Sequence, residues 1–303
     1  MRSELYAICG CPRSGTTWFH NALIRADRFR GVLGEDSEPA SRRLFVTDEN
    51  QFVHALLLRI AVGGPGNQGV WAPVGLSTLR GMLTWRFGGP DGALLKSPYY
   101  SFFVDVMHAQ GFAQKFIYIR RKIDSVAQSM IKHPFLASQI NGRIETFSSM
   151  VLGSINFETR YVPGEIALEF SRGYSNLSTV ERTLYKCLCF ESSFVELRKA
   201  LPAENQLTVN YEEIESSEEH RRKIADFLKL TARQGAKFFS MFKSPKIDDA
   251  RDEPWRTPFC ERIRATEAAL WGGGAAGDGA SSAQSRSSAV AGGSGVGRGV
   301  KIT

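Results

Sequence analysis

The chain has 303 residues, of which 43% are hydrophobic and 23% are charged. These are ordinary values for a globular protein with a sizeable core, so a disordered or fibrous chain is excluded. The net charge of +7 favours anionic ligands, but no lysine- and arginine-rich run typical of nucleic-acid-binding tails is present, so we expect no nucleic-acid partner.

The sequence also indicates the cellular compartment. An apolar strand begins almost at the N-terminus, without the basic and apolar regions of a signal peptide, and no apolar run is long enough for a membrane span. The five cysteines are odd in number and show no C-x-x-C spacing, which favours reduced thiols over a disulfide framework or a zinc site. We therefore predict a cytoplasmic protein.

The first predicted elements are a buried strand at 5–9, a loop bounded by Gly10 and Gly15, and an amphipathic helix from Thr16. Backbone N–H groups and the positive end of a helix meet at such a loop. The sequence therefore predicts a binding site for an anion. The alternative is a basic surface turn before an ordinary helix.

The loop has the spacing of a nucleoside-triphosphate P-loop, with Thr17 at its Ser/Thr position. Thr16, however, stands where the P-loop lysine would reach the β- and γ-phosphates, and Arg13 places the cation inside the loop instead. This departure disfavours a kinase or a triphosphatase and favours an anion other than a magnesium triphosphate.

Apolar strands and helices alternate through the first half of the chain. Further strands are predicted at 31–34, 93–95 and 116–119, helices at 52–62, at 99–110 and from Asp124, and an irregular segment or lid at 63–92. This alternation predicts an α/β fold with a central parallel sheet flanked by helices.

The second half is mainly helical. A capping box at 178–181 predicts a long helix ending before Pro202, followed by a strand at 206–211 and a helix capped at 216–219. After Trp271 the composition changes to Gly, Ala and Ser. We expect one domain at 1–271 and a disordered tail at 272–303.

Polar clusters follow four of the predicted strands. They are Arg13–Thr17, Glu35–Glu38, Lys96–Ser97 and Arg120–Arg121. Because ligands of open α/β sheets bind beyond the carboxyl ends of the strands, we expect these clusters to meet at one site.

The stretch from Pro12 to Trp18 reads Pro-Arg-Ser-Gly-Thr-Thr-Trp, which resembles the 5′-phosphosulfate loop of sulfotransferases. These enzymes transfer a sulfuryl group from 3′-phosphoadenosine 5′-phosphosulfate (PAPS). The resemblance implies the P-loop-containing nucleotide hydrolase-like (sulfotransferase) fold, PAPS as co-substrate and no metal. It also implies that the loop residues bind the phosphosulfate: Arg13, Ser14, Gly15, Thr16 and Thr17.

The strand at 115–121 resembles the family's 3′-phosphate motif, in which a serine follows an arginine by eight positions. Arg121 and Ser129 meet this spacing, whereas Arg120 does not but stays a close competitor. A guanidinium and a hydroxyl in the next helix suit one phosphate group.

The remaining catalytic groups follow from two further resemblances. Lys96-Ser97-Pro98 resembles the family segment with a catalytic lysine, but Pro98 stands where the small-molecule branch has its catalytic histidine. Gly34-Glu35-Asp36-Ser37 resembles the segment of the tyrosylprotein branch that carries the base. We therefore expect Glu35 to be the base, with Glu38 in reserve.

Two aromatic residues resemble those that lie near the adenine in relatives. They are Trp18, after the loop, and Tyr211, at the end of the strand at 206–211. Core packing is the alternative for both. The family's C-terminal 3′-phosphate loop has no recognisable counterpart, and Lys243, Lys246 and Arg256 are candidates without a motif.

The sequence therefore predicts a PAPS-dependent sulfotransferase acting on a hydroxyl-bearing acceptor: a carbohydrate, a peptide, a lipid or a small metabolite. A P-loop nucleotide kinase or triphosphatase and a non-catalytic nucleotide-binding protein stay open as alternatives. The acceptor's identity and the oligomeric state do not follow from the sequence.

Overall fold

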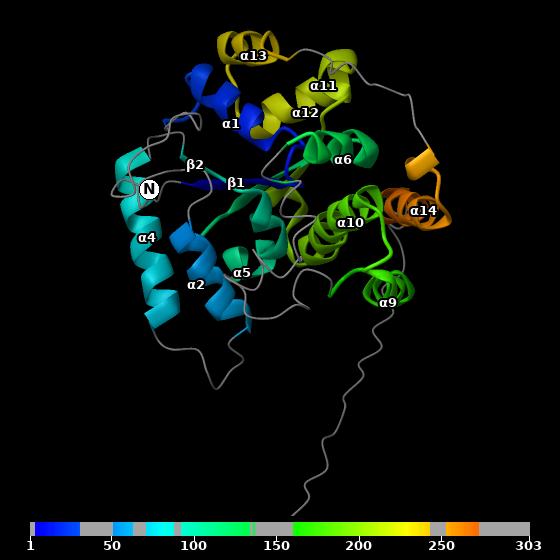
Figure 1. Ribbon diagram of the computed structural model, residues 1–303. Helices are drawn as coiled ribbons and strands as arrows, with labels where there is room; N and C mark the ends of the chain where they lie inside the picture. The colour runs from blue at the N-terminus through cyan, green and yellow to red at the C-terminus, as the bar shows by residue number, and fades with distance from the viewer. Residues whose placement is uncertain are drawn as a thin grey trace, which may run out of the picture.

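The computed structural model describes residues 4–30, 51–62, 71–87, 92–133, 136, 160–242 and 253–272. At its centre four parallel strands pair in the order β2-β1-β3-β4 (Figure 1). They are β1 (Leu5–Gly10), β2 (Ala93–Lys96), β3 (Lys115–Arg120) and β4 (Gln206–Asn210). The expected α/β class with a parallel sheet flanked by helices is confirmed.

Helices cover both faces of the sheet, so β1 is buried on both sides. Tyr6 and Ile8 face a core shared with α1 (Thr16–Arg25), α11 (Glu213–Ser216), α12 (Glu218–Leu228) and α13 (Ala232–Phe239). Leu5, Ala7 and Cys9 face the larger core on the other side, because successive strand side chains point to opposite faces.

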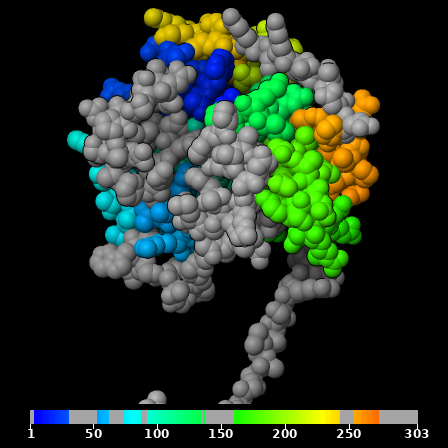
Figure 2. Space-filling model, viewed as in Figure 1, coloured from blue at the N-terminus to red at the C-terminus, as the bar shows by residue number. Residues whose placement is uncertain are grey.

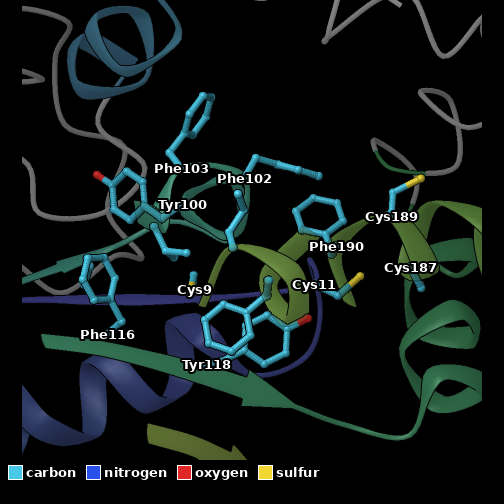
Figure 3. Close-up of a cluster of buried hydrophobic side chains, with 14 of the residues drawn as sticks. Cys9, Cys11, Tyr100, Phe102, Phe103, Phe116, Tyr118, Cys187, Cys189 and Phe190 are labelled. Carbon is cyan, nitrogen blue, oxygen red and sulfur yellow. The ribbon is translucent and has the colours of Figure 1, made fainter. Parts of the chain in front are cut away.

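Seven of the described helices contribute to this larger core. They are α2 (Gln51–Val62), α4 (Trp71–Phe87), α5 (Val104–Ala109), α6 (Ile123–Ile131), α9 (Gly164–Gly173), α10 (Thr179–Leu197) and α14 (Pro258–Gly272). Cys9 and Cys11 lie among aromatic rings in this core (Figure 3). All five cysteines are buried free thiols, as the sequence predicted.

The expectation of an irregular segment at 63–92 is wrong where the structure describes it, because α4 occupies Trp71–Phe87. Gly75 and Gly81 lower the helix propensity of this stretch. Packing compensates, since a Cβ at Gly75 would lie 3.3 Å from Leu56 of α2, and Leu76 and Leu83 are buried. Tertiary contacts with α2 thus decide the conformation.

The helix predicted at 99–110 is divided. A 3₁₀ turn, η2 (Pro98–Phe102), precedes α5, and the Ser97 side chain caps it by accepting a hydrogen bond from Tyr99 N. The capping box at Ser178 and Glu181 is confirmed at the start of α10. The strand predicted at 31–34 and almost all of the tail at 272–303 lie outside the described residues.

Within the described ranges, no helix combines the length and the apolarity that crossing a bilayer requires.

Candidate functional site

The carboxyl ends of the four strands meet at one edge of the sheet, because all of them run in parallel. This edge carries Gly10 at the end of β1, Lys96 at the end of β2, Arg121 just after β3 and Tyr211 just after β4. Three of the four predicted clusters are therefore brought together. The fourth, with Glu35 and Glu38, lies outside the described residues.

The loop between β1 and α1 requires both of its glycines. Gly10 has φ +151°, and a Cβ there would lie 2.6 Å from the Ile119 carbonyl oxygen. Gly15 has φ +106°, and its Cβ would lie 2.7 Å from the Tyr211 ring. Gly10 N also donates to Ser101 Oγ at 3.1 Å. The loop is thus held tightly against β3 and against the residue that follows β4.

The start of α1 is open to an anion. Gly15 occupies the N-cap position, so no side chain caps the first N–H groups of the helix. The Ser14 hydroxyl is buried and has no hydrogen-bond partner among the described residues. Thr16 is buried at the P-loop lysine position, and Thr17 follows it in the first turn. Backbone and hydroxyl donors, rather than a lysine, therefore line the loop.

Arg13 joins the loop to α6. This residue has φ 69°, and its Nε donates to Ser129 Oγ at 3.1 Å. The loop cation and the predicted 3′-phosphate serine, which are 116 positions apart in sequence, therefore lie side by side.

Arg120 and Arg121 have different partners. Arg120 Nη2 lies 2.5 Å from Glu267 Oε1, and its Cζ lies 4.8 Å from the Trp271 ring. Arg121 instead has its Cζ 5.5 Å from the Tyr211 ring. The geometry therefore favours Arg121 for a ligand at the loop, in agreement with the spacing argument.

The Nε of Arg121 is buried without a hydrogen bond in the described part of the chain, although Glu212 Oε1 lies 3.9 Å away. Glu212 accepts a hydrogen bond from Lys122 N at 3.0 Å. The carboxylate thus holds the backbone beside Arg121 and leaves donors of the guanidinium for another anion.

Aromatic rings form a wall beside the loop. Trp18 packs edge-to-face against Phe242, with centroids 4.1 Å apart, and lies 6.3 Å from the Tyr211 ring. Burial raises the pKa of the Tyr211 phenol, which therefore stays neutral near pH 7. Trp18 and Tyr211 are only half-buried, so part of each is open to a ligand.

Lys96 is buried at the end of β2. The neighbouring His20 is also buried, and this burial lowers its pKa to about 4, with a further contribution from the Lys96 charge. Asn21 opposes the shift through a contact of 3.1 Å between its Oδ1 and Nδ1 of the histidine. His20 is therefore neutral near pH 7.

Sequence reasoning missed Ser101, Glu212 and Phe242. Each acts through a partner that is distant in sequence: Gly10 N, Lys122 N and Trp18, respectively. The sequence shows an acidic residue, Glu212, directly after Tyr211, but it does not show that this residue binds Lys122 N. Of the three C-terminal candidates, only Arg256 is described, and it is exposed.

Among the described residues, no three or more His, Cys, Asp or Glu side chains gather in a way that would hold a metal ion.

No protein-family model and no curated protein matches the chain. The solved structures that are similar to it include three at 12% sequence identity. The match to the "Sulfotransferase Domain from the Curacin Biosynthetic Pathway" covers 88% of this chain and 97% of that chain, with a TM-score of 0.45. The match to sulfotransferase STF9 from Mycobacterium avium covers 89% of this chain and 76% of that chain, with a TM-score of 0.49. The "Sulfotransferase Domain from the Synechococcus PCC 7002 Olefin Synthase" covers 87% and 86%, with a TM-score of 0.39.

All three are named as sulfotransferases. Similarity at this level carries no argument about function, so the function is argued below from the side chains of the site.

Proposed function

We propose that the chain is a sulfotransferase that transfers a sulfuryl group from PAPS to a hydroxyl of an acceptor. The observation that carries this proposal is the hydrogen bond from Arg13 to Ser129. It joins one anion site, at the start of α1, to a second, at Ser129 and Arg121. Two adjoining anion sites suit a nucleotide that carries one anionic group on its 5′ side and another on its 3′ side.

Two buried donors of the site that make no hydrogen bond within the described ranges fit such a nucleotide. The Ser14 hydroxyl and the Arg121 Nε are buried without hydrogen bonds among the described residues, which is costly unless a ligand supplies the acceptor. One of these donors belongs to each anion site. The half-buried faces of Trp18 and Tyr211 suit a purine base.

In an in-line displacement, the acceptor oxygen forms a bond to the sulfur of PAPS while the bond from that sulfur to the bridging oxygen of the 5′-phosphate breaks, so adenosine 3′,5′-bisphosphate is the leaving group. The N–H groups at the start of α1 and the Arg13 guanidinium stabilise negative charge on the 5′ phosphosulfate. Arg121 and Ser129 hold the 3′-phosphate. Lys96 neutralises charge at the transferred group or at the bridging oxygen. Glu35 takes the proton of the acceptor hydroxyl.

Binding of adenosine 3′,5′-bisphosphate tests the nucleotide assignment. It should bind at least about tenfold more tightly than AMP, because a lost hydrogen bond to a charged group costs roughly 1.5–3 kcal/mol. Isothermal titration calorimetry measures both affinities, and equal affinities would contradict the proposal. A screen of hydroxyl-bearing acceptors with labelled PAPS then identifies the second substrate.

Two other functions give different results in the same assays. A P-loop kinase or triphosphatase would turn over ATP with magnesium, which Thr16 disfavours because it replaces the P-loop lysine. A non-catalytic nucleotide-binding protein would bind the bisphosphate but transfer nothing to any acceptor.

A further inference from the structure

Two ion pairs connect α14 to the chain on either side of Arg121. Glu267 of α14 binds Arg120, the last residue of β3, at 2.5 Å. Arg264 of α14 donates through Nε to Asp124, in the first turn of α6, at 2.9 Å. Figure 2 shows α14 (orange) at the surface beside α6 (blue-green). The segment that contains Arg121 is thus held at both ends by a single helix.

The helix itself is firmly anchored. Trp271 Nε1 donates to Glu191 Oε2 of α10 at 2.8 Å, and Arg264 Nη2 donates to the Trp255 carbonyl oxygen at 2.7 Å. Ile263 is fully buried. A helix with these contacts can fix the position of the groups that it binds.

The two ion pairs are better shielded than ordinary surface pairs. The Arg264 and Asp124 side chains are 14% and 15% exposed, and those of Arg120 and Glu267 are 28% and 12% exposed. Exposed pairs contribute little, whereas partly buried pairs are less screened and have a defined geometry.

Arg120 and Arg121 are adjacent at the end of β3, because Arg120 is the last residue of the strand and Arg121 is the first residue after it. Arg120 contacts Glu267 and Trp271, whereas Arg121 lies by the Tyr211 ring. The contacts that hold Arg120 therefore also hold the backbone from which Arg121 extends. The contact at Asp124 fixes the start of the helix that carries Ser129.

We propose that Glu267 and Arg264 are positioning residues that set Arg121 relative to Ser129 and thereby the preference for a nucleotide 3′-phosphate. This inference rests on the proposed function of the site. Neither residue touches the ligand; each acts through the backbone between Arg120 and Asp124.

The test compares the affinities for adenosine 3′,5′-bisphosphate and for AMP in Glu267→Gln and Asp124→Asn, which preserve shape and remove one charge on each side of the segment. We expect about a tenfold loss for the bisphosphate and less than about a twofold change for AMP, because only the 3′ contacts are disturbed. Arg262→Ala is the matched control, since Arg262 also lies on α14 but pairs with the exposed Glu169 of α9. It should leave both affinities unchanged.

A double-mutant cycle separates positioning from general stability. If Glu267 acts through Arg121, Glu267→Gln should cause no further loss of bisphosphate affinity in an Arg121→Ala background. A further loss there, or an unchanged affinity ratio in both single variants, would overturn the inference. If a single variant does not fold, Arg264→Lys replaces it, because lysine keeps the positive charge but lacks the planar guanidinium. The ratio of its affinities for the bisphosphate and for AMP then tests the inference. A wild-type protein without preference for the bisphosphate would instead refute the proposed function.

Discussion

At the scale of single residues, Gly15 shows how the site depends on an absent side chain. Its φ of +106° favours glycine, and the Tyr211 ring fills the space that a Cβ would need. The same ring lies beside Arg121. A substitution at Gly15 would therefore disturb both halves of the site.

We predict that Gly15→Ala lowers stability by about 1–3 kcal/mol through backbone strain and also weakens binding of adenosine 3′,5′-bisphosphate. Gly111→Ala is the control, because Gly111 has φ +60° but nothing lies within 4 Å of its Cβ position. It should share the strain but keep the affinity. Urea denaturation and calorimetry measure the two effects, and an unchanged affinity in Gly15→Ala would contradict the described loop.

Glu35 is the residue that we propose as the general base for the acceptor hydroxyl. We predict that Glu35→Gln lowers kcat by roughly 10²–10⁴-fold, because the amide cannot accept the proton. Bisphosphate affinity should barely change, since the proposed role of Glu35 concerns the acceptor and not the nucleotide.

Glu38→Gln is the control for this prediction, as it removes the same charge three positions away. Single-turnover transfer at saturating PAPS compares the two variants. Normal transfer by Glu35→Gln together with lost transfer by Glu38→Gln would move the base to Glu38.

At the scale of elements, α10 carries a carboxyl group in the core. Burial and the charge of the nearby Glu267 raise the pKa of Glu191 to about 8, although Arg120 opposes the shift. Between the ordinary value of 4.5 and about 8, the folded state holds a proton that the unfolded state releases. The contribution of Glu191 to stability is thus complete at low pH and is lost as the pH rises to about 8.

We predict that Glu191→Gln gains stability relative to wild type between pH 5 and pH 8.5, because the amide is neutral throughout and can still accept the hydrogen bond from Trp271. Urea denaturation at the two pH values measures the difference. Glu196→Gln, on the same helix but exposed, should show no such gain. An equal effect of Glu191→Gln at both pH values would show that the wild-type carboxyl does not titrate in this window.

At the scale of the whole molecule, Trp271 marks where docking of the C-terminal helix ends. Arg120 and Arg198 lie 4.8 Å and 4.9 Å from its ring, and its Nε1 binds Glu191. The Gly-, Ala- and Ser-rich stretch that follows has little apolar surface to bury.

We predict that truncation after Gly272 leaves the melting temperature and the bisphosphate affinity unchanged, whereas Trp271→Ala costs at least about 2 kcal/mol of stability. Thermal denaturation of both variants makes the comparison. A large drop in melting temperature on truncation would show that the tail belongs to the domain.

Interactions between near neighbours in the chain were predictable from the sequence. Three such features depend only on residues that are close in the sequence, so their patterns can be recognised in it: the two loop glycines, the capping box at Ser178 and Glu181, and the apolar strands. The parallel sheet followed from the alternation of strands and helices. The meeting of Arg13, Lys96 and Arg121 at one edge then follows from the sheet.

Contacts between distant segments were decided by the tertiary structure alone. α4 is helical because it packs on α2, despite its glycines. Arg120 turns to α14 while Arg121 turns to Tyr211, although the two side chains are chemically identical. The sequence by itself determined the loop and the class of fold, because these depend on local backbone geometry and on hydrophobic periodicity. Only the packed molecule decided which partners Arg120 and Arg121 contact and which helix holds the segment between them, because those partners lie 90 or more positions away in the sequence.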